Sequence, residues 1–167
     1  MKQLLYLHVI VTLLVVTALP CLAVRINSPA PDFALKDLQG STQGLSLHKG
    51  KVVLLNFWST TCGPCVVELP SLNSLYKELR QSGLLVLGIA IDPSEKPVRE
   101  LVGKLRVEFP NMLDSNKDVF FDSYGLFGQP ISIIIDRNGI VREKIVGSVD
   151  WTAPQTKAKI LNYLKGR

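Results

Sequence analysis

Histidine and cysteine are scarce in this chain, which has two histidines and three cysteines among its 167 residues. Beyond the N-terminal segment, the only residues of these types are His48, Cys62 and Cys65. A structural zinc site takes four such ligands, so the scarcity argues against a zinc-binding domain. We therefore expect no metal site and no cofactor.

The chain also lacks internal repeats, low-complexity tracts and any cluster of basic residues interleaved with aromatics. A length of 167 residues without a repeat corresponds to one domain. The formal net charge is +5, but the basic residues are scattered along the chain. A nucleic-acid-binding surface would show a basic stripe, so we expect no nucleic-acid partner.

Charge is absent from a stretch near the N-terminus, because residues 4–19 contain no Asp, Glu, Lys or Arg. Residues 1–23 are predicted to be a signal peptide, which leaves residues 24–167 as the mature domain. The alternative is an uncleaved anchor that tethers the chain to a membrane through residues 4–23, since about 20 apolar residues can span a bilayer. A lipid-modified Cys21 is a third alternative, although the residues before it do not resemble a lipoprotein signal.

Two cysteines lie where a predicted strand gives way to a predicted helix. Residues 52–58 are apolar at nearly every position, which is typical of an interior strand covered on both faces. The helix begins at or just after Cys62, carries apolar residues at spacings of three and four, and is expected to end at Gly83. Pro70 lies inside this pattern, so we predict a bend there and not a break.

The spacing of Cys62 and Cys65 predicts redox chemistry. At the start of the helix, the sulfur of Cys62 faces unpaired backbone N–H groups and the positive end of the helix dipole, which should lower the pKa of this thiol. Cys65 lies one turn further in and should resolve the mixed disulfide that Cys62 forms with a partner. A purely structural disulfide is the alternative, but it would close too short a loop to stabilise the fold much.

The rest of the chain alternates strand and helix patterns. Continuous apolar or β-branched runs predict buried strands, and amphipathic runs predict helices. The Asn-Gly pair at 138–139 is a strong hairpin signal, and Ser94 or Asp92 is the expected helix cap. The predicted strands are 84–91, 131–135 and 140–146, the predicted helices are 94–105, 118–124 and 153–164, and a short hairpin is expected within 29–47.

The motif Trp-Ser-Thr-Thr-Cys-Gly-Pro-Cys at residues 58–65, followed by Glu-Leu-Pro at 68–70, resembles the thioredoxin superfamily. Within it, the chain is similar to the exported TlpA/ResA type of thiol-disulfide oxidoreductase. Thr61 departs from the Trp that many relatives have before the first cysteine. The resemblance implies an α/β, thioredoxin-like fold, with a central mixed β-sheet flanked by helices and an N-terminal β-hairpin extension. It covers nearly all of residues 29–165 and includes segments 30–33, 49–53, 124–125, 128–130 and 135–139.

Glu68 is a candidate catalytic residue. It lies one turn after Cys65, where its carboxylate can exchange a proton with that thiol directly or through water. The resemblance supports this role, because ResA-like proteins carry a glutamate at this position. The alternative is an ordinary acidic residue in the first turns of a helix, favoured by the helix dipole and exposed to water.

Gln129 and Pro130 precede a β-branched run that predicts the next strand. A trans proline is the default, since only about 5–6% of such bonds are cis. The superfamily, however, places a cis-proline opposite its dithiol, which leaves the backbone of the preceding residue free to pair with substrate. The resemblance therefore implies a cis bond and substrate contacts here and at Gly63 and Pro64. Trp58 most simply packs in the core, and its role as a substrate-contacting lid is implied by relatives alone.

The dithiol implies an enzyme, a thiol-disulfide oxidoreductase that acts on the disulfides of exported proteins. Exported compartments tend to oxidise thiols, so such a protein is either a disulfide donor or a reductant supplied with electrons from elsewhere. The Gly-Pro pair between the cysteines resembles thioredoxin, a reductant near about −270 mV, and favours a reductase. The resemblance implies a membrane thiol reductant of the DsbD/CcdA type as electron donor. It also implies a location in the periplasm or on the outer face of the cytoplasmic membrane, and a role in cytochrome c maturation.

Three other functions are compatible with such a fold. A thiol peroxidase of the peroxiredoxin-like type would have a proline ahead of its reactive cysteine, which residues 59–61 lack. A copper chaperone of the Sco type would need a wider cysteine spacing and a histidine after His48. A non-catalytic chaperone or docking module would need an unreactive sulfur at Cys62.

Overall fold

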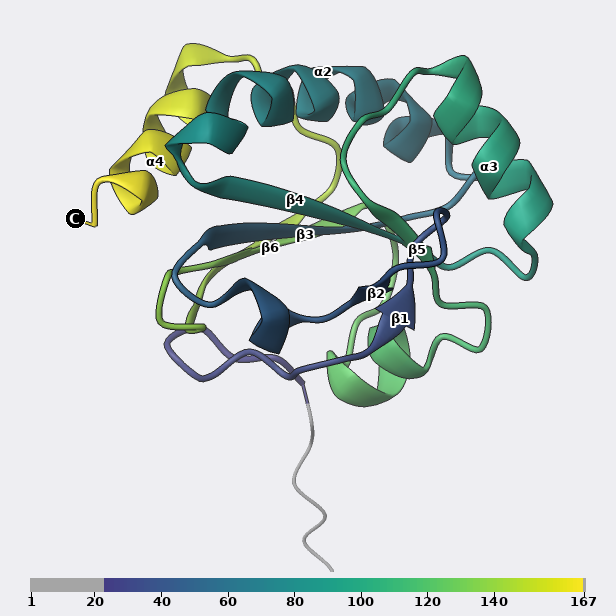
Figure 1. The fold of residues 1–167 in the computed structure, drawn as a ribbon, viewed down its shortest axis with the longest axis horizontal. Helices are drawn as coiled ribbons and strands as arrows, with labels where there is room; N and C mark the ends of the chain where they lie inside the picture. The colour runs from purple at the N-terminus through teal and green to yellow at the C-terminus, as the bar shows by residue number, and fades with distance from the viewer. Residues whose placement is uncertain (1–22, 167) are drawn as a thin grey trace, which may run out of the picture.

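The computed structural model of the chain describes residues 23–166. The predicted signal peptide or anchor lies outside the described residues, except for Ala23. Within the described range, no helix combines the length and the apolar character needed to cross a bilayer. These residues form a central sheet with long helices on one face and shorter segments on the other (Figure 1).

Five strands form the central sheet, in the order β5-β4-β3-β6-β7. β3 (Val52–Trp58) lies in the middle and pairs in parallel with β4 (Leu84–Ala90) and antiparallel with β6 (Ile131–Ile135). β5 (Asn111–Leu113) extends the parallel half, and β7 (Val141–Val146) extends the antiparallel half. The sheet is therefore mixed, as predicted, and its central strand leads directly to the cysteines.

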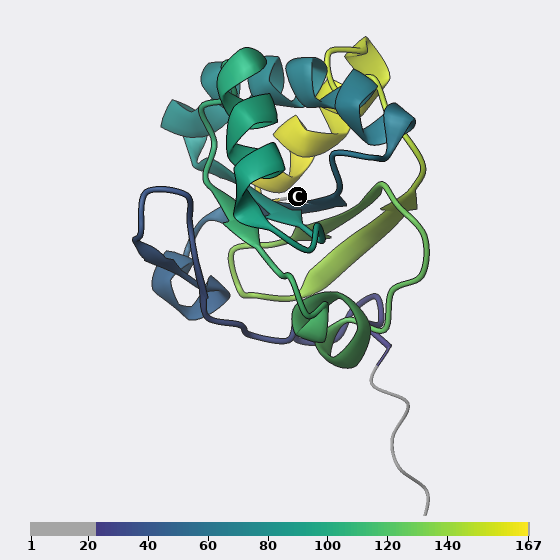
Figure 2. The ribbon, with the colours of Figure 1, turned by 90° about the vertical axis from the view of Figure 1, so that its right-hand side faces the viewer.

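Successive side chains of β3 enter two different hydrophobic cores, because strand side chains alternate between the faces of a sheet. Phe57 belongs to one core and Trp58 to the other. The core around Trp58 is covered by α2 (Gly63–Leu79), α3 (Glu95–Lys104) and α4 (Pro154–Leu164), which lie together above the sheet (Figure 2). The helix that carries the cysteines is thereby packed directly onto the central strand.

The opposite face of the sheet is covered by short elements. β1 (Leu35–Lys36) and β2 (Thr42–Gln43) form the predicted N-terminal hairpin, although each strand is only two residues long. The 3₁₀ helix η1 (Leu45–His48) leads from this hairpin into β3. η3 (Asp118–Ser123) contributes Phe120 and its neighbours to the core around Phe57. η3 is a π-helix, a form often found at functional sites.

Most predicted elements are confirmed, with small differences at their ends. α2 continues through Pro70, and the 3₁₀ turn η2 (Arg80–Ser82) carries it to Gly83, whose left-handed φ of 100° ends the helix as predicted. Ser94 occupies the N-cap position of α3, while its side chain makes no capping hydrogen bond. β5 was not predicted, because three residues are too few to show a periodic pattern.

Candidate active site

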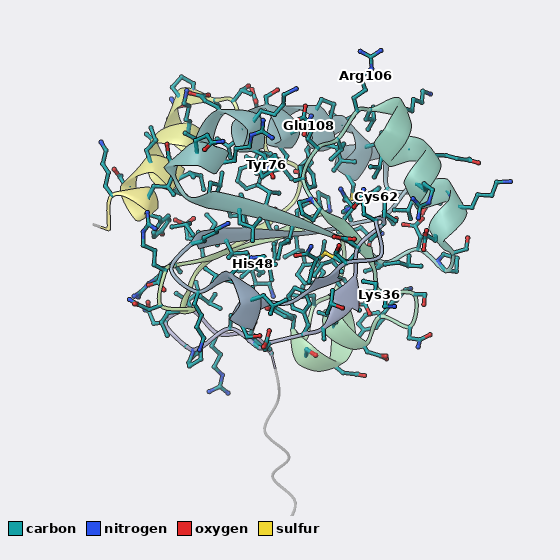
Figure 3. The ribbon with its side chains drawn as sticks, viewed as in Figure 1. Lys36, His48, Cys62, Tyr76, Arg106 and Glu108 are labelled. Atoms are coloured by element: carbon teal, nitrogen blue, oxygen red, sulfur yellow. A yellow bond between two sulfur atoms is a disulfide. The ribbon has the colours of Figure 1, made fainter. Side chains whose placement is uncertain are left out.

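Cys62 and Cys65 form a disulfide at the amino end of α2, with their Cα atoms 5.3 Å apart. Figure 3 shows Cys62 on the side of the molecule where β3 ends and α3 lies. Cys62 is the N-cap residue, and its sulfur accepts a hydrogen bond from the backbone N–H of Cys65 at 3.2 Å. Free N–H groups at a helix start also stabilise a thiolate, so this geometry suits a sulfur nucleophile.

The two sulfurs differ in their access to solvent. Cys65 has no exposed surface and packs in the core with Leu69, whereas Cys62 is partly exposed. Gly63 and Pro64, which separate them, are both exposed. A thiol from another protein can therefore reach Cys62 and not Cys65, which agrees with the predicted order of attack.

The Gln129–Pro130 peptide bond is cis, as predicted. The carbonyl oxygen of Gln129 lies 3.7 Å from the Cys62 sulfur. The two segments meet because β3 and β6 are antiparallel neighbours, so the end of β3 lies beside the start of β6. The backbone of Gln129 thus borders the only exposed part of the disulfide among the residues that the structure describes.

Glu68 is 2% exposed, and its carboxylate is held by one donor from β3 and one from the loop between β7 and α4. Oε1 accepts a hydrogen bond from Asn56 Nδ2 at 2.7 Å, and Oε2 accepts one from the backbone N–H of Val149 at 3.0 Å. Burial raises the pKa of Glu68, although the hydrogen bonds from Val149 and Asn56 oppose this shift. The water exposure expected under the alternative interpretation of Glu68 is therefore wrong, whereas its catalytic role stays a prediction.

Asn56 is a site residue that sequence reasoning missed. It also donates to Ser132 Oγ at 3.0 Å, so it links Glu68 to β6. A buried polar side chain without partners is costly, which explains why these three residues occur together. The available signal was a single asparagine in the otherwise apolar strand at 52–58.

Trp58 belongs to the same hydrophobic core as Cys65. Its side chain has no exposed surface, and its indole N–H donates to Asn111 Oδ1 at 3.1 Å. It therefore packs in the core, as the simpler interpretation predicted. The substrate contact implied by relatives would require this part of the fold to open.

The turn between β3 and α2 is held from two sides by contacts that the sequence did not reveal. The carboxylate of Asp92, which follows β4, accepts hydrogen bonds from the backbone N–H and the hydroxyl of Thr60. On the other side, Gln129 Nε2 donates to Ser59 Oγ at 3.1 Å. Asp92 thus fixes the turn that positions Cys62 and does not cap α3.

A cavity of about 400 Å³ lies at the other end of β3, where Asp32, His48 and Asp136 contribute to its walls. None of the four residues of the Cys-Gly-Pro-Cys motif lines it. Within residues 23–166, no three His, Cys, Asp or Glu side chains are grouped so that they could hold a metal ion. The residues around the Cys62–Cys65 disulfide therefore form the site whose geometry indicates a reaction, namely thiol-disulfide exchange.

Comparison with known proteins agrees with this geometry. Residues 26–144 match the AhpC/TSA family. The chain belongs to this family, within the thioredoxin superfamily. It is 35% identical over 141 residues to the thiol-disulfide oxidoreductase ResA of Bacillus thuringiensis (strain Al Hakam), a match that covers 84% of this chain and 78% of that protein.

Two further proteins extend the comparison. The ResA of Geobacillus thermodenitrificans is 34% identical over 143 residues, which cover 86% of this chain and 78% of the relative. The crystal structure of a thiol:disulfide interchange protein of the thioredoxin family from Chlorobium tepidum superposes with a TM-score of 0.70 at 28% identity, over 86% of this chain and 98% of that chain. The thioredoxin-like fold and the thiol-disulfide oxidoreductase activity are thereby confirmed, whereas the roles of single residues stay predictions.

Proposed function

We propose that this thiol-disulfide oxidoreductase works as a reductase, with Cys62 as its nucleophile. The position of the Cys62 sulfur carries the proposal: it is partly exposed, caps α2, and lies beside the Gln129 carbonyl. A helix start stabilises the thiolate that attack requires. The Gly-Pro pair between the cysteines, which resembles reducing thioredoxin, supports the direction of electron flow.

In the first step, the Cys62 thiolate attacks one sulfur of a substrate disulfide. A bond forms between Cys62 and that sulfur, the substrate S–S bond breaks, and the second substrate sulfur leaves as a thiolate and takes up a proton. The backbone of Gln129 and the exposed Gly63 and Pro64 border the place where the substrate chain would lie. The product of this step is a mixed disulfide.

In the second step, Cys65 gives up its proton and attacks the Cys62 sulfur. The Cys62–Cys65 bond forms, the mixed disulfide breaks, and the remaining substrate thiolate is released, so two electrons have passed to the substrate. Glu68 lies one turn after Cys65 on the same helix, and burial raises its pKa, which suits a group that accepts and returns this proton.

The substrates and the electron donor follow from the predicted export of the chain. If residues 1–23 direct export, the mature domain acts in the periplasm, or at the outer face of the cytoplasmic membrane when the segment is retained. The substrates are then disulfides of exported proteins, and apocytochrome c is one candidate among them. A membrane thiol reductant of the DsbD/CcdA type would return the disulfide to the dithiol.

The reduction potential tests the direction. The mature domain, residues 24–167, is equilibrated with glutathione buffers, and the oxidised fraction is measured by alkylation of free thiols. We expect a potential below about −200 mV, in the range of reductants. A value above about −150 mV belongs to disulfide donors and would overturn the proposal. Cys62→Ser is the matched control, because it cannot form the bridge.

Substrates and donor are identified by trapping. A Cys65→Ser variant cannot resolve the mixed disulfide, so partners should stay linked to Cys62 in cell extracts. The Cys62→Ser variant, expressed to the same level, should trap none of them. Fractionation of the same cells reports whether the protein lies outside the cytoplasm.

A further inference from the structure

Aromatic side chains form a continuous path from the core to the surface beside the active site. Phe57 in β3 packs against Phe120 in η3, with ring centroids 5.8 Å apart. Phe120 packs against Phe121 at 4.9 Å, and Phe121 packs against Phe127 at 5.8 Å. The first two rings are buried, whereas Phe121 is 41% exposed and Phe127 is 80% exposed. The outer pair, Phe121 and Phe127, therefore presents apolar surface to solvent while it packs against aromatic residues of the core.

The backbone that carries the outer pair is shaped by a buried carboxylate and by two glycines. The buried carboxylate of Asp114 accepts hydrogen bonds from the backbone N–H groups of Val119 at 3.3 Å and Phe120 at 2.9 Å, which fixes the start of η3. Gly125 and Gly128 flank the loop that carries Phe127, with φ values of 58° and 78°. These are left-handed conformations that glycine adopts without strain. An aromatic side chain has only two rotatable bonds and so loses little conformational freedom on binding, which is typical of interface anchors.

The outer pair is continuous with the place where a substrate disulfide must lie. Phe127 is two residues before Gln129, whose carbonyl oxygen lies 3.7 Å from the Cys62 sulfur. Two residues span at most about 7 Å of extended chain. A polypeptide that is bonded to Cys62 and runs along the Gln129 backbone therefore brings its nearby side chains within reach of Phe127.

We infer that Phe121 and Phe127 form a substrate subsite that receives a bulky apolar side chain within about three residues of the reacting cysteine. The occupant is an extended segment of polypeptide, because its backbone must lie beside the carbonyl of Gln129 while its cysteine reaches Cys62. The inference rests on the proposed function and adds the class of substrate. Substrates would then be recognised while they are unfolded, when such side chains are accessible.

The test uses short peptides whose cysteine carries thionitrobenzoate as a mixed disulfide. In one series a phenylalanine occupies each position within three residues of the cysteine in turn, and in the matched series a serine does so. The reduced protein attacks the peptide sulfur and expels thionitrobenzoate, whose absorbance gives the rate constant. We expect at least one phenylalanine peptide to react about fivefold or more faster than its serine counterpart.

Two variants assign this preference to the subsite. Phe127→Ala should reduce the ratio of the two rate constants to below about twofold. Leu47→Ala is the matched control, since Leu47 is 62% exposed but precedes β3 at the end of the strand away from the disulfide. It should keep the wild-type ratio.

Other results would overturn the inference. Ratios within twofold at every position of the wild-type peptides would mean that the rings do not select substrate, while the exchange reaction itself would remain intact. Loss of a concentration-dependent dimer on Phe127→Ala, seen by sedimentation, would mean that a second copy covers the rings. If the reduced protein releases no thionitrobenzoate from any peptide, the proposed function fails, and the subsite fails with it.

Discussion

Glu68 is a carboxyl group that the fold removes from water and surrounds with donors. Asn56 and the backbone of Val149 each donate to one of its oxygens. These contacts compensate only part of the cost of burying a charge, so burial raises the pKa of Glu68 above 4.5. The protonation state of this one residue should therefore affect the stability of the fold, and under the proposed mechanism it also affects the chemistry of the Cys65 thiol.

The stability of the protein should depend on pH through Glu68. Below pH 4.5 the group is protonated in both the folded and the unfolded chain, and its contribution is fully present. As the pH rises through the raised pKa, the folded state must ionise a buried group, and this contribution is lost. Each unit of pKa displacement corresponds to about 1.4 kcal/mol. The Gln side chain of Glu68→Gln does not titrate. The free energy of unfolding of this variant, relative to that of the wild type, should therefore be higher at pH 8 than at pH 4.5.

Urea denaturation of the oxidised proteins at the two pH values measures this difference. Glu100→Gln is a suitable control, because Glu100 is exposed on α3. Its difference from the wild type should be the same at both pH values. A Glu68→Gln difference that is equally independent of pH would contradict the prediction.

The rate of mixed-disulfide resolution should also depend on Glu68. If its carboxylate takes the proton of Cys65, Glu68→Gln should slow the second step by about tenfold or more, since general base catalysis contributes at least that much. The pH profile should also lose the step that belongs to this carboxyl group. Stopped-flow measurement of peptide release between pH 5 and pH 9 gives both quantities. An unchanged profile would exclude the proton-transfer role.

At the scale of elements, the sequence predicted what depends on a local pattern. The run at 131–135 is β-branched or apolar almost throughout, and the helix after Cys62 shows regular apolar spacing, so both elements were found. β5 forms because its three residues pair with the end of β4, and no pattern within the segment shows this. The contacts of Asn56 with Ser132, and of Asp92 with Thr60, join elements that are distant in sequence. Only the folded chain brings these residues together.

The π-helix η3 should depend on the carboxylate of Asp114. Asp114→Ala leaves the backbone N–H groups of Val119 and Phe120 without their acceptor, and the expected cost is about 2 kcal/mol or more in free energy of unfolding. Asp114→Asn keeps one acceptor and should cost about half as much. Asp122→Asn, at an exposed position of η3, should change stability by less than about 0.5 kcal/mol. Equal effects of the three substitutions in urea denaturation would contradict the role of Asp114.

At the scale of the whole molecule, one side chain ties together three segments of the fold. Arg137 follows β6, and its guanidinium donates to the carbonyl oxygen of Gly50 at 2.6 Å and to that of Leu164 at 3.0 Å. Gly50 leads into β3, and Leu164 is the last residue of α4. The end of the C-terminal helix is thereby attached near the start of β3, at the end of this strand opposite the disulfide.

Removal of this guanidinium should loosen the C-terminal helix more than the sheet. Arg137→Ala should cost about 1 kcal/mol, because its hydrogen bonds are exposed to solvent. Amide hydrogen exchange should accelerate in the last turn of α4 and remain slow in β3. Arg99→Ala, whose side chain pairs with Glu95 within α3, should change stability by less than about 0.5 kcal/mol. Uniform acceleration across the chain would contradict this local role.

The burial of Cys65 has a kinetic consequence. In the oxidised protein, only the sulfur of Cys62 is accessible to the thiol of the electron donor. In the reduced protein, the same sulfur is the one that reacts with a substrate disulfide. The substrate disulfide and the electron donor must therefore react with the same sulfur, one after the other. We expect ping-pong kinetics, with parallel lines in double-reciprocal plots. Excess substrate should inhibit the reaction, because it competes with the electron donor for access to Cys62.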